Sequence, residues 1–159
     1  MLDQLQSFAE SLPAAVQWLG IILLGAIPFV ESYLGSVIGI VAGLSPWVAI
    51  PAAIVGNVIS MLAFVFTAHG VRQAATKGRE APALSPRRQR LKERFDRYGV
   101  AGVSLLGQLV LPSQITSAAI VGFGASRNAV ILWQTISIIL WGVLFGVLAM
   151  LGVNIIGRA

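Results

Sequence analysis

The chain has 159 residues, of which 57% are hydrophobic and 11% are charged, whereas soluble domains carry about 25% charged residues. So few polar residues cannot cover the surface of a soluble protein, and we expect a single all-α polytopic membrane domain over residues 1–159. The absence of cysteine excludes disulfides and thiolate chemistry. Without a nucleophile–base pair or a cluster of metal ligands, we expect no enzymatic activity, no cofactor and no metal.

Residues 1–13 carry hydrophobic side chains at helical spacing. Those that recur at intervals of three or four residues are Leu2, Leu5, Phe8 and Leu12. This spacing places them on one face of a helix. Because short amphipathic helices lie in the membrane interface, we expect an interfacial helix on the outer surface.

The apolar segment 14–43 is interrupted by a proline and a glutamate, Pro28 and Glu31. Each half has about 14 residues and would span about 21 Å as a helix, which is less than the roughly 30 Å of a hydrocarbon core. The two halves together can enter the membrane, turn and leave on the same side. The segment therefore predicts a re-entrant helical hairpin.

A transmembrane helix over 46–69 and a basic loop or helix over 70–97 follow this hairpin. Nine of the eleven Lys and Arg residues lie in 72–97 beside three acidic residues, for a local net charge of +6. A basic patch between apolar segments is typical of a cytoplasmic loop rather than of a nucleic-acid site. We expect this loop to be cytoplasmic, without a nucleic-acid partner, and able to contact anionic membrane lipids.

Segment 98–125 predicts a second re-entrant hairpin, because Pro112 interrupts it and leaves halves of about 13 and 12 residues, each under about 20 Å. Polar residues flank this proline: Gln108, Ser113, Gln114 and Thr116. A second transmembrane helix follows over 127–157. In both halves of the chain a broken hairpin thus precedes a spanning helix.

A hairpin returns to its own side of the membrane, whereas a spanning helix crosses it, so the two halves must have opposite orientations. Such inverted repeats are typical of secondary transporters, whose sites form where broken helices meet near the midplane. Two spans are few for a closed pathway, and GxxxG patterns at 35–43 and 142–146 permit close helix packing. We therefore expect a homodimer packed through these glycine faces.

Glu31 is the first candidate site residue, because an ionisable residue inside a membrane suggests function by default. Burial disfavours the charged form of a carboxyl, so Glu31 could carry a proton or neutralise a cationic substrate. The alternative is a protonated carboxyl that binds a carbonyl released at the Pro28 break. We favour the functional interpretation.

The other candidate site residues are the polar and proline residues of both halves: Pro28, Asn57, Gln108, Pro112, Ser113 and Gln114. Pro28 and Pro112 would set the hairpin tips. The polar residues beside Pro112 either line a substrate path or hydrogen-bond the first hairpin, and the sequence favours neither. Asn57 lies within a spanning helix, where an interhelical hydrogen bond is the simpler interpretation.

Four stretches carry a family resemblance: GAIPFVES at 25–32, VGN at 55–57, RYGVAGVSLLGQLVLPSQITSA at 97–118 and LWQ at 132–134. They resemble the bacterial family of small multidrug export proteins, and the layout resembles the wider DedA/VTT (SNARE-associated) superfamily. This resemblance implies a multi-pass protein of the bacterial inner membrane that moves lipids or lipid-linked carriers, often coupled to protons. Gln108 and Gln114 stand where that superfamily has arginines, which puts phosphate-bearing lipids in doubt.

These features predict a proton-coupled transporter of DedA-like architecture that moves a lipid or a lipophilic or cationic small molecule through Glu31. One alternative is a four-span small multidrug/proton antiporter, in which 14–43 would cross the membrane fully. Another is a membrane scaffold that does not transport, with the basic loop as its working surface. Neutralising Glu31 would then change nothing, whereas neutralising the loop would.

Overall fold

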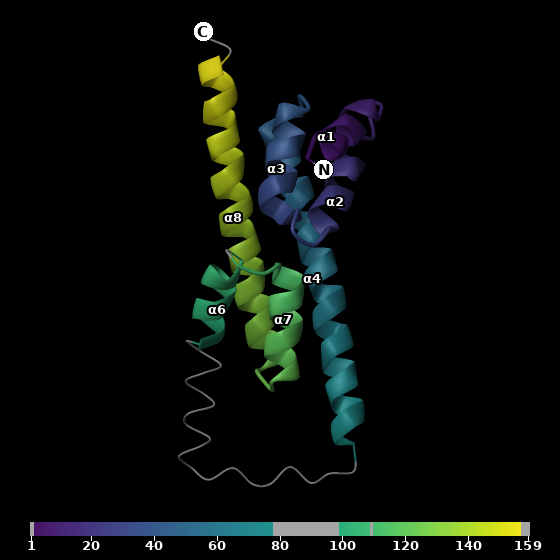
Figure 1. The fold of residues 1–159 in the computed structure, drawn as a ribbon, viewed down its shortest axis with the longest axis vertical. Coiled ribbons are helices and arrows are strands. Elements are labelled where there is room, and N and C mark those ends of the chain that lie inside the picture. Colours follow the sequence, from purple (N-terminus) through teal and green to yellow (C-terminus); the bar gives the residue numbers. More distant parts are fainter. Residues whose placement is uncertain (1, 78–98, 109, 157–159) are drawn as a thin grey trace. The chain divides into compact units, whose positions relative to one another are not determined.

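The computed structural model describes residues 2–77, 99–108 and 110–156. Within these residues it contains seven α-helices and no strand, which confirms the all-helical prediction. The helices are α1 (Leu2–Ser11), α2 (Gln17–Ala26), α3 (Glu31–Val41), α4 (Pro46–Thr76), α6 (Val100–Gly107), α7 (Ser113–Gly122) and α8 (Arg127–Ile156) (Figure 1). Most of the basic loop, 78–98, lies outside the described residues.

Helices α4 and α8 are long and apolar enough to cross a membrane. They have 31 and 30 residues, or about 46 and 45 Å at 1.5 Å per residue. The expectation of two long apolar helices is therefore confirmed. Helix α4 continues past residue 69, where the first span was expected to end, because Gln73, Ala74 and Ala75 favour helix beyond the apolar run.

The chain divides into two compact units, each of which is described by itself. Unit 1 comprises Met1–Ser60 and Ile138–Ala159, and unit 2 comprises Met61–Ser137. The divisions fall inside α4 and α8, so each unit contains a part of both long helices. Unit 1 also contains α1, α2 and α3, and unit 2 also contains α6 and α7. That all of the chain forms one membrane domain stays a prediction.

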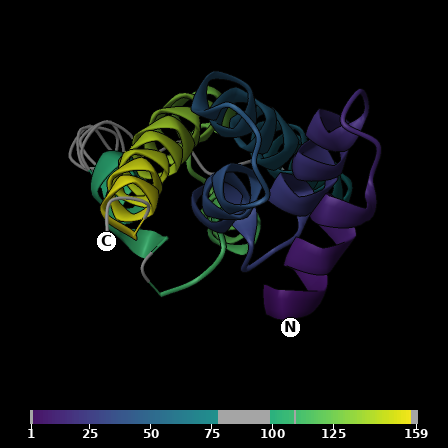
Figure 2. The same ribbon diagram turned by 90° about the horizontal axis from the view of Figure 1, so that it is seen from above.

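In unit 1, α2 and α3 pack against each other, and α1 packs against both (Figures 1 and 2). Helices α2 and α3 have 10 and 11 residues, or about 15 and 17 Å, and each is shorter than a hydrocarbon core. The buried face of α1 is centred on Ala9, whereas Phe8 is 41% exposed. The expected hydrophobic face of α1 is therefore rotated toward Ala9, because α1 packs on α2 and α3.

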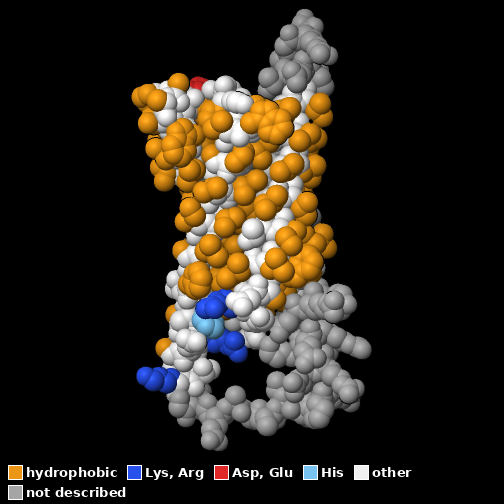
Figure 3. Space-filling view, turned by 180° about the vertical axis from the view of Figure 1, so that it is seen from behind, with side chains coloured by type: hydrophobic (Ala, Val, Ile, Leu, Met, Phe, Trp, Pro, Cys, Tyr) orange, Lys and Arg blue, Asp and Glu red, His pale blue; other side chains and the backbone are white. Residues whose placement is uncertain are grey.

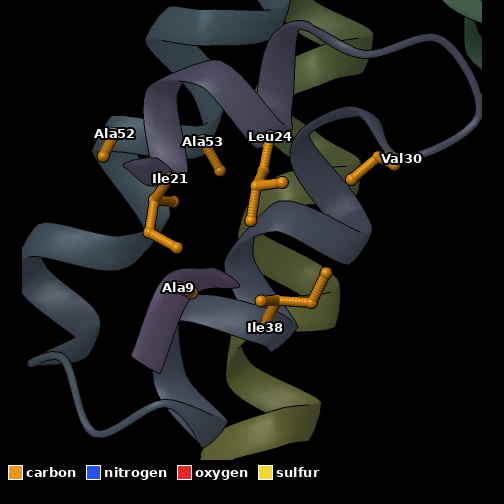
Figure 4. Close-up of a cluster of buried hydrophobic side chains, with 7 residues drawn as sticks. All are labelled: Ala9, Ile21, Leu24, Val30, Ile38, Ala52 and Ala53. Atoms are coloured by element: carbon orange, nitrogen blue, oxygen red, sulfur yellow. The ribbon is translucent and has the colours of Figure 1, made fainter. Parts of the chain in front are cut away.

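The core of unit 1 is a cluster of buried hydrophobic side chains from α1, α2, α3, α4 and the α2–α3 turn (Figure 4): Ala9, Ile21, Leu24, Val30, Ile38, Ala52 and Ala53. Glycine allows the helix backbones to approach closely here. A Cβ atom on Gly25 would lie 2.9 Å from the Cα atom of Ala53, and one on Gly56 would clash with the carbonyl of Ile22. Helices α2 and α4 therefore pack with almost no side chain between them.

All but Gly43 of the glycines expected to form a dimer interface contact other helices of the same unit. A Cβ atom on Gly142 would lie 3.1 Å from the Cβ atom of Ser32, and one on Gly39 would lie 2.8 Å from the Cβ atom of Ala49. These small residues are covered by α3 and α4. A homodimer would have to use a different surface, because these glycine faces are already packed within the chain.

In unit 2, α6 and α7 pack against each other (Figure 1). They have 8 and 10 residues, or about 12 and 15 Å, which is again too short to cross a membrane singly. The helices are separated by residues 108–112, and Pro112 directly precedes α7 with extended backbone (ψ 144°). A proline is well tolerated there because the first helical turn needs no N–H donor from it.

Candidate functional site

Glu31 is the first residue of α3 and its side chain is fully buried in unit 1. It follows the turn at Pro28, where the backbone N–H groups of Val30 and Glu31 both donate to the carbonyl of Ile27, at 3.1 and 3.0 Å. This turn reverses the chain between α2 and α3. The carboxyl therefore lies at the tip of the first hairpin, as expected for a residue three positions after Pro28.

The backbone at this tip is strained. Phe29 has a φ of +71° and Glu31 a φ of +54°, in the left-handed region that costs a residue with a Cβ atom about 1–2 kcal/mol. Such conformations persist where the surroundings impose them, and they concentrate at functional sites. The hydroxyl of Tyr33 donates to the carbonyl of Phe29 at 3.1 Å and so supports the turn from α3.

The other buried polar side chains of unit 1 carry hydroxyl and amide groups. Ser32 and Ser36 on α3 and Asn57 on α4 are all fully buried. The Ser32 hydroxyl donates to the carbonyl of Ile138 at 2.8 Å, and the Ser36 hydroxyl donates to the carbonyl of Ser32 at 2.7 Å. Unit 1 thus combines one buried carboxyl with several neutral polar groups, a set that can hold a proton or a cation.

Unit 2 has its own buried polar residues where its hairpin meets α8. We call them the glutamine cluster: Ser104, Gln108, Ser113, Gln114, Ser117, Gln134 and Ser137, each less than 9% exposed. Hydrogen bonds connect them across the helices. The Gln134 Nε2 atom donates to the carbonyl of Ser113 at 3.0 Å, and the Ser137 hydroxyl donates to Gln108 Oε1 at 3.0 Å. Helix α8 therefore binds both sides of the break at 108–112.

Three buried atoms of the glutamine cluster have no hydrogen-bond partner among the described residues: Ser104 Oγ, Gln108 Nε2 and Gln134 Oε1. A buried polar group without a partner costs about 1–3 kcal/mol, so such groups usually bind water or a ligand. One of these atoms is a donor, one is an acceptor and the hydroxyl can be either. The cluster can therefore bind an uncharged group that both donates and accepts hydrogen bonds.

The structure brings together the site residues expected in the second hairpin and places the others in unit 1. Gln108, Ser113 and Gln114 all belong to the glutamine cluster, and Pro112 is buried beside them. Glu31, Pro28 and Asn57 lie in unit 1.

Two residues of the cluster that bind the hairpin, Gln134 and Ser137, are not among the residues expected from the sequence. They lie within the apolar segment 127–157, three positions apart and so on one face of α8. Their signal in the sequence was a pair of polar residues at helical spacing inside an apolar segment, and this pattern could have identified them.

Comparison of the chain with protein-family models, with curated proteins and with solved structures gave no match. The resemblance to small multidrug export proteins therefore stays a prediction.

Proposed function

We propose that this protein is a membrane-embedded, proton-coupled transporter in which the Glu31 carboxyl binds a proton and a cationic group in turn. One observation carries this proposal: Glu31 is fully buried at a strained hairpin tip, in a chain with two helices long and apolar enough to cross a membrane. Retaining a buried carboxyl in such surroundings is costly, so it is usually tied to function.

The proposed architecture has two re-entrant hairpins, α2–α3 and α6–α7, and two transmembrane helices, α4 and α8, arranged as inverted repeats. Support comes from the short helices, which pack as pairs and are each too short to span a hydrocarbon core. The same pairing argues against the four-span antiporter, in which 14–43 would cross the membrane fully. Buried polar side chains at both breaks are what irregular backbone at membrane depth requires.

We further propose a multi-pass protein of the bacterial inner membrane with segment 72–97 in the cytoplasm. This placement follows from the family resemblance and from the nine basic residues of that segment. A homodimer is part of the proposal, with an interface outside the glycine faces.

The transported molecule is proposed to be lipophilic and cationic or neutral. Glu31 in unit 1 favours a cationic group, whereas the glutamine cluster in unit 2 by itself favours a neutral group that exchanges hydrogen bonds with amides and hydroxyls. Gln108 and Gln114 carry no positive charge, so they offer no ion pair to a phosphate. A lipophilic cation is therefore the first substrate class to test, and a lipid without a recognised phosphate is the second.

Proton release on binding of tetraphenylphosphonium tests the proposal. Purified protein in weakly buffered detergent would receive this cation while a pH electrode follows the solution. We expect release of up to one proton per chain, absent in Glu31→Gln and retained in Glu10→Gln, because Glu10 is an exposed glutamate on α1. No release from the folded, unmodified protein would rule out exchange of this cation for a proton on Glu31.

A further inference from the structure

Two arginines of unit 2 extend from their own helices to other elements. A Cβ atom built on Gly124 would lie 3.0 Å from Nη2 of Arg72, so the Arg72 guanidinium of α4 packs on the turn after α7. The Arg127 guanidinium of α8 lies over the Phe66 ring of α4, 5.4 Å from its centre. In Figure 3, Lys or Arg side chains lie beside the His side chain, next to a surface of hydrophobic side chains, and a further Lys or Arg side chain lies apart from them.

No carboxylate is available to these arginines within the described part of unit 2. Residues 61–77, 99–108 and 110–137 contain neither Asp nor Glu. The residues that follow Arg72 in the sequence add to the excess of positive charge, because 73–97 has eight basic residues against three acidic ones. This end of unit 2 therefore favours an anion supplied from outside the chain.

An open apolar groove of about 310 Å³ lies between α4 and α7 of the same unit. It is lined by Ala63, Phe64, Thr67, Ala68 and Ala118. The Thr67 hydroxyl donates to the carbonyl of Ala63 at 2.8 Å within α4, so its hydrogen-bond donor is satisfied and does not require a polar ligand. The groove is therefore suited to a hydrocarbon chain.

The groove leads toward Arg72, and Phe66, which the Arg127 guanidinium covers, is the neighbour in sequence of the groove residue Thr67. Arg72 lies four residues beyond Ala68 on α4, and Gly124, which the Arg72 guanidinium contacts, lies in the turn after α7. At 1.5 Å per helical residue, the interval from Ala68 to Arg72 along α4 corresponds to about 6 Å. A hydrocarbon groove with Arg72 beyond its end and Arg127 on the same helix pair matches one molecule with an acyl chain and an anionic headgroup.

We propose that unit 2 binds one anionic phospholipid, with an acyl chain in the α4–α7 groove and the headgroup phosphate on Arg72 and Arg127. Arginine recognises phosphate through paired N–H donors, and its aliphatic stem can lie along the lipid chain. The lipid would be a bound component and not a cargo. Its binding is therefore separate from transport through Glu31 and shares with it only insertion in a membrane.

Native mass spectrometry of the purified protein with phosphatidylglycerol or phosphatidylcholine tests this proposal. We expect one phosphatidylglycerol per chain, bound more tightly than phosphatidylcholine, and binding about 30-fold weaker in the Arg72→Gln/Arg127→Gln variant. The matched control is Arg87→Gln/Arg88→Gln, which removes the same charge from the basic segment and should weaken binding far less. Ala118→Phe, which fills the groove without changing charge, should also weaken binding.

Four results would overturn the proposal. They are equal binding of the two lipids by the unmodified protein, an equal loss in the two double-arginine variants, unchanged binding in Ala118→Phe, and displacement of the lipid by an equal concentration of soluble glycerol 3-phosphate. The comparison of the two lipids needs no variant, so it tests the preference for an anionic lipid even if a variant fails to fold. Retained lipid binding in Glu31→Gln would separate this site from the transport proposal.

Discussion

The Ser32 hydroxyl donates a hydrogen bond to the backbone carbonyl of Ile138, 2.8 Å away and 106 residues later in the chain. The bond joins the first hairpin to α8. Ser32 directly follows Glu31, the residue that bears the buried carboxyl. Gly142 lies one turn further along α8, and a side chain at this position would be too close to Ser32. The position of the Glu31 turn therefore depends on close packing between α3 and α8.

Gly142→Ala should destabilise the protein by about 1–3 kcal/mol, as overpacking of a filled core does. The added Cβ atom would lie 2.9 Å from Ile54 Cγ1 and 3.1 Å from the Ser32 Cβ atom. Thermal unfolding in detergent, followed by circular dichroism, measures the change. Gly152→Ala is the control on the same helix, because nothing lies within 4 Å of its Cβ position. Equal effects of the two changes would contradict the packing described.

Phe29→Asn should raise the melting temperature, because asparagine tolerates the left-handed backbone of φ +71° better than phenylalanine. The expected gain is about 1 kcal/mol or less, and little packing is lost since Phe29 is 58% exposed. Phe123→Asn serves for comparison, because Phe123 is exposed with an ordinary φ of −74°. A lower melting temperature in Phe29→Asn than in Phe123→Asn would argue against strain at the tip.

Ser137 and Gln108 should show coupled effects on stability. Ser137→Ala leaves Gln108 Oε1 without its 3.0 Å hydrogen bond, which should cost about 1–3 kcal/mol. A double-mutant cycle with Gln108→Met should give a coupling of about 1 kcal/mol. Ser137→Ala and Thr76→Ala should be additive, because the Thr76 hydroxyl bonds within α4. Additivity in both cycles would mean that the glutamine cluster does not hold the second hairpin to α8.

Cysteine labelling can test the re-entrant hairpins, since the chain has no cysteine of its own. We expect Glu10→Cys and Ser45→Cys, on either side of the first hairpin, to react with a membrane-impermeant maleimide from the same side of the membrane. Lys77→Cys and Asn128→Cys should react from the opposite side. All four residues are exposed. Labelling of positions 10 and 45 from opposite sides would mean that the first hairpin crosses.

The breaks in the helices could be predicted because proline acts locally. Pro28 and Pro112 interrupt apolar segments, and the short helices end and begin beside them. Long hydrophobic runs likewise predicted α4 and α8. The end of α4 at Thr76 was missed, since helix propensity, rather than hydropathy, decides how far a helix extends beyond an apolar run.

The partners of the polar residues could not be predicted, because they depend on which helix faces are packed together. Gln108 and Ser113 stand out in the sequence, yet their contacts with Ser137 and Gln134 require α8 to lie across the hairpin break. The glycine faces were assigned to a dimer interface because the sequence does not show which helix packs against them. A GxxxG pattern indicates close packing without indicating the helix that is packed.

Proton flux in proteoliposomes is the most direct test of proton exchange through Glu31. Vesicles containing the protein and the pH indicator pyranine would be exposed to an inward gradient of tetraphenylphosphonium. We expect the lumen to become more alkaline as protons leave in exchange for the cation, with no such change in Glu31→Gln and the full change in Glu10→Gln. Equal alkalinisation in Glu31→Gln and the unmodified protein would contradict a role for the buried carboxyl, and its absence from all three would contradict exchange of this cation.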